Sequence, residues 1–325
     1  MQFDPRRPSH RVGHLCSVGG WAAQSLVGWY LGAGFGAICL AGEGPNLPTQ
    51  LPSASHDAGA APKARLASAS NDAKAVGRTL DSSTAGRMTT GRIEADPIAR
   101  ARQVVADCKA RYESVEDYTC TFFKRERIDG SLSPPHIMVV KARTKPSSLY
   151  FKFLQPYAGR EAIYVQGRNN GKIVAHEVGI ARVIAGTMHL DPKGDMAMEE
   201  NRHPITEAGL GAMIDTVKAR WDSELHPGES VLLFHPNARV SERSCFMVES
   251  IHPKPAPGFF FHKVKFYVDK ELGLPIRFEA YDWPKGTGIE PELMEEYTYA
   301  NLRLNVGLKD RDFDPANKQY SFGRF

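Results

Sequence analysis

The spacing of apolar positions changes near Asp117. Between Asp96 and Val115, apolar residues recur every three or four positions, which predicts one buried face of a helix. Asp96-Pro97 supplies an N-cap acid followed by proline at the first helical position, so the predicted helix spans Pro97–Ser114. Basic residues such as Arg102 fall between the apolar positions and are expected on the solvent side. The apolar positions are Ile98, Ala101, Val105, Cys108, Tyr112 and Val115.

After Asp117 the apolar period is close to two, which predicts strands. Asn169-Asn170-Gly171 marks a tight turn between two of them, and a second helix is predicted from Pro204 to about Trp221. Short turns without regularly alternating helices favour an antiparallel sheet. The predicted fold is therefore α+β, a large curved antiparallel sheet covered by an N-terminal helix and an inserted helix. The expected strands are 118–128, 137–144, 148–154, 161–166, 172–175, 230–235, 245–251, 259–268, 275–281 and 295–304.

The chain before this pattern has a different composition. Basic residues precede an uncharged apolar run over residues 25–41, so residues 1–41 are interpreted as an export signal or membrane anchor. Residues 42–95 are rich in Ala, Ser, Gly and Pro and are predicted to be a disordered linker, because they cannot bury enough apolar area to form a core. The folded domain is then expected over residues 96–325, in the periplasm or anchored in the cell envelope.

Charge and cysteine content narrow the classes of protein further. A net charge of +4, with acids and bases interspersed, gives no basic stripe for nucleic acid. None of the five cysteines forms a C-x-x-C pair, which leaves zinc and thioredoxin-type sites without support. Cys108, Cys120 and Cys245 are expected to be buried as small apolar residues, with a Cys120–Cys245 disulfide as the alternative. No metal or cofactor is predicted.

The sequence lacks the usual catalytic signatures, with no G-x-S-x-G, H-E-x-x-H or P-loop motif. Its best polar cluster contains His189, Arg202 and His203, which could orient a carboxylate or phosphate. The structural alternative is helix entry, with Asn201 or His203 capping a helix that begins at Pro204. Arg160, in a predicted turn, is expected to pair with a carboxylate.

Several phrases resemble a bacterial domain family of unknown function that occurs in exported proteins, notably of planctomycetes. They are Tyr118-Thr-Cys-Thr-Phe-Phe-Lys-Arg-Glu-Arg, Pro156-Tyr-Ala-Gly-Arg-Glu161, Asn201-Arg-His-Pro-Ile-Thr206 and Tyr299-Ala-Asn-Leu-Arg-Leu-Asn305. That family is in turn similar to the LolA-like superfamily of lipoprotein carriers and envelope sensors. The resemblance covers residues 96–325 and implies an incomplete β-barrel, covered by helices, around a hydrophobic cavity.

Together these observations favour non-catalytic binding of a lipid or of an acylated protein, at or near a membrane surface. Phe123, Phe151, Phe153 and Tyr164 are predicted to line the cavity, with Arg160, His189, Arg202 and His203 at its rim. The helix Pro97–Ser114 is the predicted lid, with the inserted helix beside it. A protein-interaction or sensor module without a lipid is the second hypothesis, and a hydrolase that uses His189 or His203 with Asp191 is the third.

Overall fold

The structure, a computed structural model, describes residues 54–56, 96–179 and 186–323. Its helices are α1 (Pro97–Tyr112), α3 (Asp195–Met198) and α4 (Leu210–Glu224), with 3₁₀ turns η1 (Asn169–Gly171), η2 (Ile205–Glu207) and η3 (Asp310–Phe313). Its strands are β1 (Ala54–His56), β2 (Asp117–Ile128), β3 (Ser131–Leu132), β4 (His136–Arg143), β5 (Ser148–Gln155), β6 (Glu161–Val165), β7 (Ile173–His176), β8 (Thr187–Leu190), β9 (Val231–Val240), β10 (Arg243–Ile251), β11 (Lys263–Asp269), β12 (Pro275–Tyr281) and β13 (Leu293–Leu304).

The described strands form one open antiparallel sheet made of two meanders. β2 to β8 make the first meander and β9 to β13 the second, and the last strand of the chain pairs with β2 to join them. We call this β2/β13 junction the seam. Thirteen strands belong to this sheet in the part of the chain that the structure describes, and it does not close on itself. The predicted fold class is confirmed.

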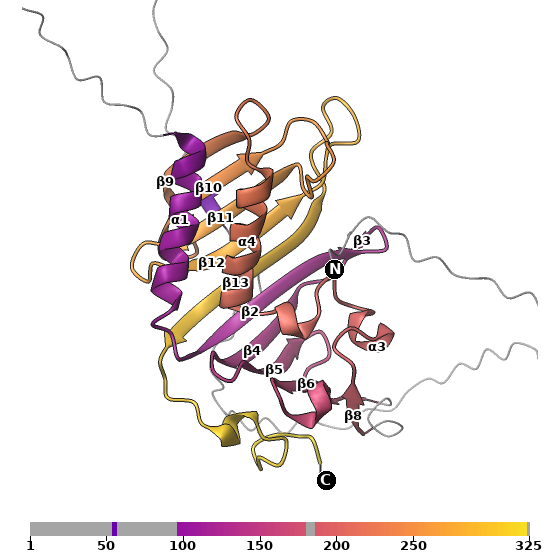
Figure 1. The fold of residues 1–325 in the computed structure, drawn as a ribbon. Helices are drawn as coiled ribbons and strands as arrows, with labels where there is room; N and C mark the ends of the chain where they lie inside the picture. Colours follow the sequence, from indigo (N-terminus) through magenta and orange to yellow (C-terminus); the bar gives the residue numbers. More distant parts are fainter. Residues whose placement is uncertain (1–53, 57–95, 180–185, 324–325) are drawn as a thin grey trace, which may run out of the picture. The chain divides into compact units, whose positions relative to one another are not determined.

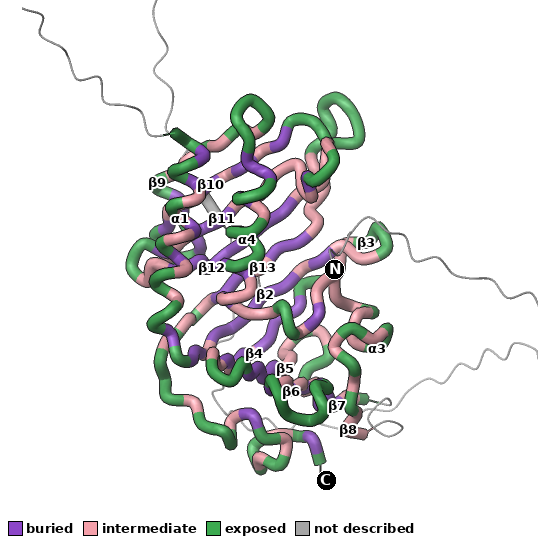
Figure 2. The backbone as a smooth tube through the Cα atoms, in the orientation of Figure 1, coloured by how far each residue is buried: buried purple, intermediate pink, exposed green. Residues whose placement is uncertain are grey.

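Helices α1 and α4 lie side by side on one face of the sheet, over the second meander (Figure 1). Their apolar side chains pack directly on strand residues, and buried positions run along the strands beneath them (Figure 2). Val105 of α1 and Ile214 of α4 are each 0% exposed. We call this side the helix face. The space between these helices and the second meander is therefore occupied by side chains.

The predicted N-terminal helix is confirmed, although it ends at Tyr112. The Asp96 carboxylate accepts a hydrogen bond from the Ile98 amide at 3.0 Å, as its N-cap position predicts. Arg102, expected on the solvent side, makes contacts with α4. Its guanidinium donates to the main-chain oxygens of Trp221 at 3.2 Å and Leu225 at 3.0 Å, so α1 satisfies carbonyls at the C-terminus of α4.

The second helix does not begin at Pro204, because Gly209 interrupts the chain with a φ of 99°. Residues 205–207 form only the 3₁₀ turn η2, and α4 starts at Leu210. The Tyr118 hydroxyl accepts a hydrogen bond from the Leu210 amide at 3.0 Å and lies where a side chain at position 209 would begin. The predicted caps, Asn201 and His203, therefore do not cap this helix.

Other departures are local. The expected strand 259–268 starts at Lys263, because Phe259 instead stacks on His252 with ring centroids 4.0 Å apart. The C-terminal tail packs Phe313 and Phe322 on the sheet face opposite the helices. Cys108, Cys120 and Cys245 are buried free thiols, which confirms burial and leaves no Cys120–Cys245 disulfide.

The expected export signal lies outside the described residues. Within the range expected to be a linker, the structure describes β1, which pairs antiparallel with Ala238–Val240 of β9. In the described ranges, no helix is both long and apolar enough to cross a membrane.

Candidate functional site

Four consecutive residues, Glu200 to His203, hold one segment against the helix face: the Glu200 side chain contacts the β5–β6 turn, and the next three side chains contact β2 or β13. This segment follows α3, and we call it the clamp. The segment leaves α3 in this way because the helix ends at Met198. The side-chain amide of Asn201 then donates to the Ala197 main-chain oxygen at 2.8 Å. The clamp lies across the seam and the start of the first meander.

The inner half of the clamp neutralises two buried carboxylates. Glu126 of β2 and Glu295 of β13 lie directly opposite each other in the seam, and like charges in such positions repel. Arg202 Nε lies 3.2 Å and His203 Nε2 2.8 Å from the same Glu295 oxygen. The Arg202 amide donates to Glu126 at 2.9 Å, and the Tyr297 hydroxyl donates to it at 2.5 Å.

His203 and Glu295 each favour the charged form of the other. Burial alone would lower the pKa of His203, but the adjacent Glu295 carboxylate, helped by Glu207, raises it to about 10. Burial would likewise raise the pKa of Glu295, yet His203 and Arg202 hold it below its usual value. At neutral pH the pair is therefore an imidazolium and a carboxylate. Only the Glu295 side of this pair is buried, and Arg202 remains as its second partner.

Lys124 connects the inner and outer halves of the clamp. Its ammonium group lies 3.1 Å from Glu126 and donates to the main-chain oxygen of Glu200 at 3.0 Å and to the Asn201 side chain. The Lys124 side chain is buried. The backbone of the clamp is thus held down at its centre.

The outer half of the clamp is a single, partly exposed carboxylate, that of Glu200. Arg160 Nη1 lies 2.8 Å from one oxygen of Glu200, and the Tyr157 hydroxyl donates to the other oxygen at 2.8 Å. Arg160 also binds Glu177 through Nε at 2.9 Å. Burial opposes ionisation of Glu200, but Tyr157 and Arg160 lower its pKa below the usual value. Arg160 therefore pairs with carboxylates, as the sequence indicated.

His136 extends the same surface, and sequence reasoning missed it. It begins β4, and its ring makes edge contacts with Phe153 and Tyr157, at centroid distances of 6.0 and 6.2 Å. Burial, and then the charge of Lys124, lower its pKa to about 4. His136 is therefore neutral at physiological pH and serves as an aromatic neighbour. The signal that places His136 beside the clamp is its pairing with Lys124 across β2 and β4, and this pairing depends on the strand register.

The structure brings three of the predicted lining residues to one face. Phe151 and Phe153 alternate along β5 on the helix face, and Tyr164 pairs across from Leu149 on the same side. Phe123 points the other way, because its neighbour Phe122 occupies the helix face. Phe153 and Tyr164 are only partly buried.

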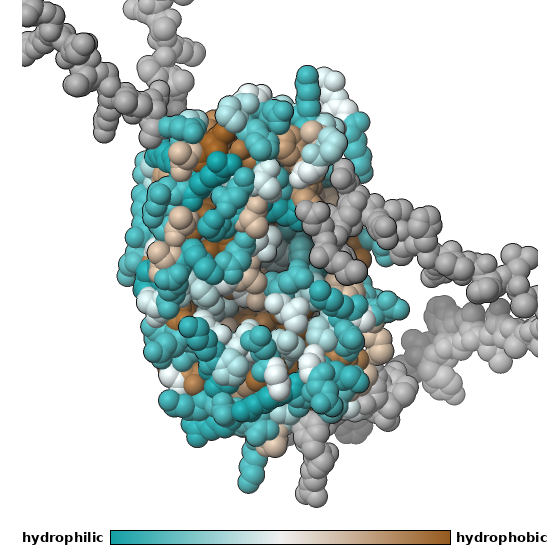
Figure 3. All heavy atoms as spheres, in the orientation of Figure 1, coloured by the Kyte–Doolittle hydropathy of each residue, from teal (hydrophilic) through white to brown (hydrophobic). Residues whose placement is uncertain are grey.

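Of the four predicted rim residues, Arg160, Arg202 and His203 meet the clamp contacts. His189 stands apart, exposed on β8. Figure 3 shows hydrophobic residues between hydrophilic ones on this side, and a hollow between α4 and the half of the molecule that carries α3. Three of the four residues predicted at a cavity rim therefore lie in the clamp or contact it.

Aromatic rings line the seam beside the clamp. Phe122 stacks near Tyr299 and Tyr297, with centroids 4.8 and 5.9 Å away, and Tyr297 stacks on Phe278 at 6.1 Å. The Tyr297 ring thus lies among aromatic rings while its hydroxyl reaches the buried carboxylates. The helix face is consequently apolar along the seam and charged only under the clamp.

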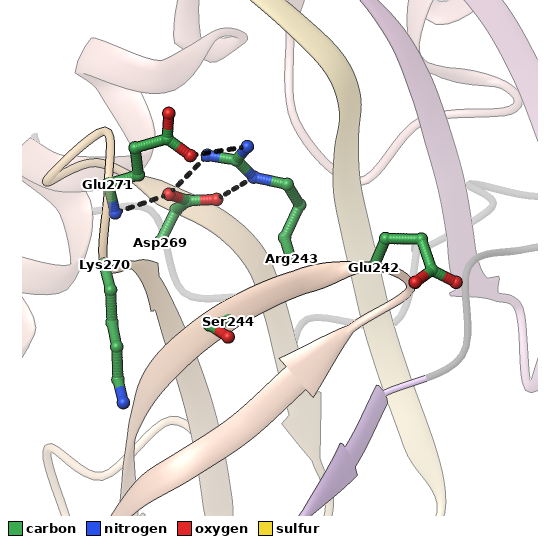
Figure 4. A pocket seen from close by; sticks show the side chains of 6 residues that line it. All are labelled: Glu242, Arg243, Ser244, Asp269, Lys270 and Glu271. Carbon is green, nitrogen blue, oxygen red and sulfur yellow. Dashed lines mark hydrogen bonds and ion pairs between the residues drawn. The ribbon is translucent and has the colours of Figure 1, made fainter.

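A pocket of about 190 Å³ lies elsewhere, between the β9–β10 and β11–β12 turns (Figure 4). The Asp269 carboxylate accepts bonds from Arg243 at 2.5 and 2.8 Å and from the amides of Glu271 and Leu272 at 2.9 Å. These groups satisfy one another and hold the two turns together. The pocket is too polar for an acyl chain.

The polar groups expected of a hydrolase are not assembled around the predicted histidines. Asp191 accepts a hydrogen bond from the Lys193 amide at 2.8 Å in a turn, and His203 is taken up by Glu295. Ser230 Oγ lies 3.2 Å from His252 Nδ1, but it also accepts from the His226 amide and donates to the Glu224 main-chain oxygen, both at 3.3 Å. This serine therefore closes a turn.

Comparison with known families places these residues in context. The family described as "Protein of unknown function (DUF1571)" matches residues 115–322. The chain belongs to this family. The match spans most of the range over which the sequence resembled such a family, and it includes the clamp, the seam and the turn that carries Arg160. A search of curated proteins found no match.

Solved structures of similar arrangement have little sequence in common with the DUF1571 chain. It is similar to the Mycobacterium tuberculosis lipoprotein LppX, at 9% identity over 66% of this chain and 99% of that one, with a TM-score of 0.38. It is similar to a LolA superfamily protein from Nitrosomonas europaea, at 10% identity over 66% and 97%, with a TM-score of 0.27. A lipoprotein-sorting protein domain from Vibrio parahaemolyticus gives 13% identity over 67% and 97%, with a TM-score of 0.31.

Proposed function

We propose that this protein binds the acyl chain of a lipid or of an acylated protein on the helix face, beneath the clamp, without catalysing a reaction. One observation carries the proposal. Phe153 and Tyr164 are partly exposed aromatic residues on the helix face, and the clamp, which contacts Arg160 next to Phe153, is held by ion pairs rather than by apolar packing. The outer half of such a cover, held by Glu200, can open and close while the inner half stays on Glu126 and Glu295 and the core under α1 and α4 stays intact.

The magnitudes support an acyl chain as the ligand. Burying it contributes roughly 0.8 kcal/mol per CH₂, so a 14-carbon chain contributes on the order of 10 kcal/mol before entropic costs. The partly exposed Arg160–Glu200 pair is of the kind that contributes about 1 kcal/mol or less. Opening the outer half of the clamp is thus offset by burial of a few methylene groups.

The cell envelope is the proposed location. It is supported by the uncharged apolar run over residues 25–41, which follows basic residues as in export signals. An acyl ligand is consistent with that compartment, because membranes there supply lipids and acylated proteins.

Uptake of a fluorescent fatty acid by the full chain tests the proposal. Phe153→Ala should weaken binding several-fold while the circular dichroism spectrum stays unchanged, because a partly buried ring on the ligand surface is lost. Phe246→Ala is the matched control, since Phe246 is also a partly buried phenylalanine of the helix face but lies on β10 beneath Arg100. Equal weakening by both variants, or wild-type protein that takes up no fatty acid and carries no lipid from its own membranes, would refute acyl binding.

A protein-interaction module is the second candidate, and the outer edge of β9 favours it. Among the described residues, no strand pairs with Val231–Asn237 on that edge, and Val231 and Leu233 are 45% and 42% exposed. An extended peptide can add to such an edge as a further strand. The filled space under α1 and α4 also agrees with this reading.

A further inference from the structure

The turn between β5 and β6 presents two hydrogen-bond donors to one carboxylate. Tyr157 adopts a φ of 60°, in the left-handed region, and Gly159 a φ of 93°. Main-chain bonds from Arg160 to Tyr157 and from Gly159 to Phe153, each 2.9 Å, close the turn. The backbone thus fixes Tyr157 and Arg160 on the same side. Strained non-glycine residues of this kind concentrate at functional sites.

Arg160 is held in place independently of the clamp. Its Nε binds Glu177, and its guanidinium lies 4.0 Å from the centre of the Tyr157 ring and 5.5 Å from that of Phe153. Only Nη1 is directed to Glu200. If Glu200 left, the guanidinium and the Tyr157 hydroxyl would remain in position, beside the half-buried Phe153 ring.

Glu200 occupies these donors as a ligand carboxylate would. Each of its two oxygens meets a different donor at 2.8 Å, and its side chain is 37% exposed, so the pair is weakly held. The Arg202–Glu295 pair contrasts with it, because its side chains are only 15% and 5% exposed. The outer half of the clamp is therefore the part that exchanges readily.

We propose that Arg160 and Tyr157 form a carboxylate-binding site that Glu200 fills when no ligand is present. The ligand is a long-chain fatty acid, whose carboxylate displaces Glu200 while its chain lies along Phe153, Phe151 and Tyr164. Arginine suits a planar carboxylate because its donors match the two oxygens. This inference rests on the proposed function and names the ligand class of the same surface.

Displacement of a fluorescent acyl probe from the full chain, by palmitate and by 1-hexadecanol, tests the site. The two competitors have the same chain length, and only palmitate carries a carboxylate. Wild-type protein should prefer palmitate. Glu200→Gln should strengthen palmitate binding roughly tenfold, because the internal competitor loses its charge, and should leave hexadecanol unchanged. Arg160→Ala should abolish the preference.

Lys152→Ala is the matched control, because Lys152 is a cation of β5, the strand that leads into the turn of Arg160, and lies on the face opposite the helices near Glu161. It should leave the palmitate to hexadecanol ratio unchanged. A ratio that neither Glu200→Gln nor Arg160→Ala alters would overturn the carboxylate site while acyl binding stands. Tighter binding of hexadecyl phosphate than of palmitate would also overturn it. Failure of every variant to bind either competitor would refute acyl binding, and the carboxylate site with it.

Discussion

At the scale of single residues, the seam depends on partners that lie far apart in the chain. Arg160, Arg202 and His203 could be singled out in the sequence as polar site candidates, but the carboxylates that they contact could not. Glu126 and Glu295 lie on strands in which apolar and polar residues alternate, and a charged residue of such a strand normally faces water. The two glutamates are 169 positions apart in the chain. Phe122 and Phe123 are adjacent, so only one can face the helices. The sequence does not say which.

The His203–Glu295 pair makes stability depend on pH. The pKa of His203 is about 10 in the folded protein and near 6.5 when unfolded, so its stabilising contribution is complete below pH 6.5 and is lost as pH rises through 10. His203→Gln should therefore lower the free energy of unfolding by about 1 kcal/mol at pH 6, a value reduced because the His203 side chain is 39% exposed. Urea unfolding at pH 6 and pH 10 measures this. A difference that grows with pH would contradict the assignment.

At the scale of elements, local signals were reliable where no distant contact competed with them. The Asp96-Pro97 cap and the three-and-four spacing located α1 to within two residues of its end. The start of α4 was misplaced because Pro204 looked like a helix start, while the positive φ of Gly209 and its contact with Tyr118 depend on tertiary structure. β8 and α3 carry too few periodic positions to be predicted.

The two sides of α1 should respond differently to an added carboxylate. Val105→Asp should cost several kcal/mol, because an unpaired charge would be buried, whereas Ala99→Asp in the exposed first turn should change little. Arg102→Asp should cost about 1–2 kcal/mol, since it removes the donors that satisfy the last carbonyls of α4 and places a negative charge beside them. Thermal unfolding ranks the three variants. A silent Arg102→Asp would show that these capping bonds contribute nothing.

At the scale of the whole molecule, the antiparallel class followed from strand spacing, but the seam did not. β13 pairs with β2 across most of the folded chain, and no local pattern encodes that contact. The seam also separates two parts of the sheet that are covered differently. Helices α1 and α4 lie over the second meander, and their apolar cluster continues onto β4 and β5 of the first, while the clamp, whose contacts are polar, lies over the seam and the start of the first meander.

If a cover opens for a ligand as proposed, this division favours the outer half of the clamp over α1 as the part that opens. α1 and α4 contribute side chains to the main apolar core, including the fully buried Val105 and Leu210. Lifting them would expose that core, and removing even one large buried side chain costs a few kcal/mol. The burial of these residues therefore disfavours the expected lid Pro97–Ser114, and we propose the outer half of the clamp in its place.

Thiol labelling distinguishes the two alternatives, because the buried cysteines sample both faces of the sheet. Cys108 on α1 and Cys120 on β2 belong to the core of the helix face, whereas Cys245 lies in the cluster on the opposite face. Burial raises the pKa of all three thiols, to about 12 for Cys108 and Cys245. We expect single-cysteine variants of the full chain to label slowly, with rates normalised to those in urea. The three cysteines should label at the same rate as one another, both without palmitate and with it, because reaction then requires global unfolding. Faster labelling of Cys108 and Cys120 than of Cys245 would instead show that α1 lifts from the sheet.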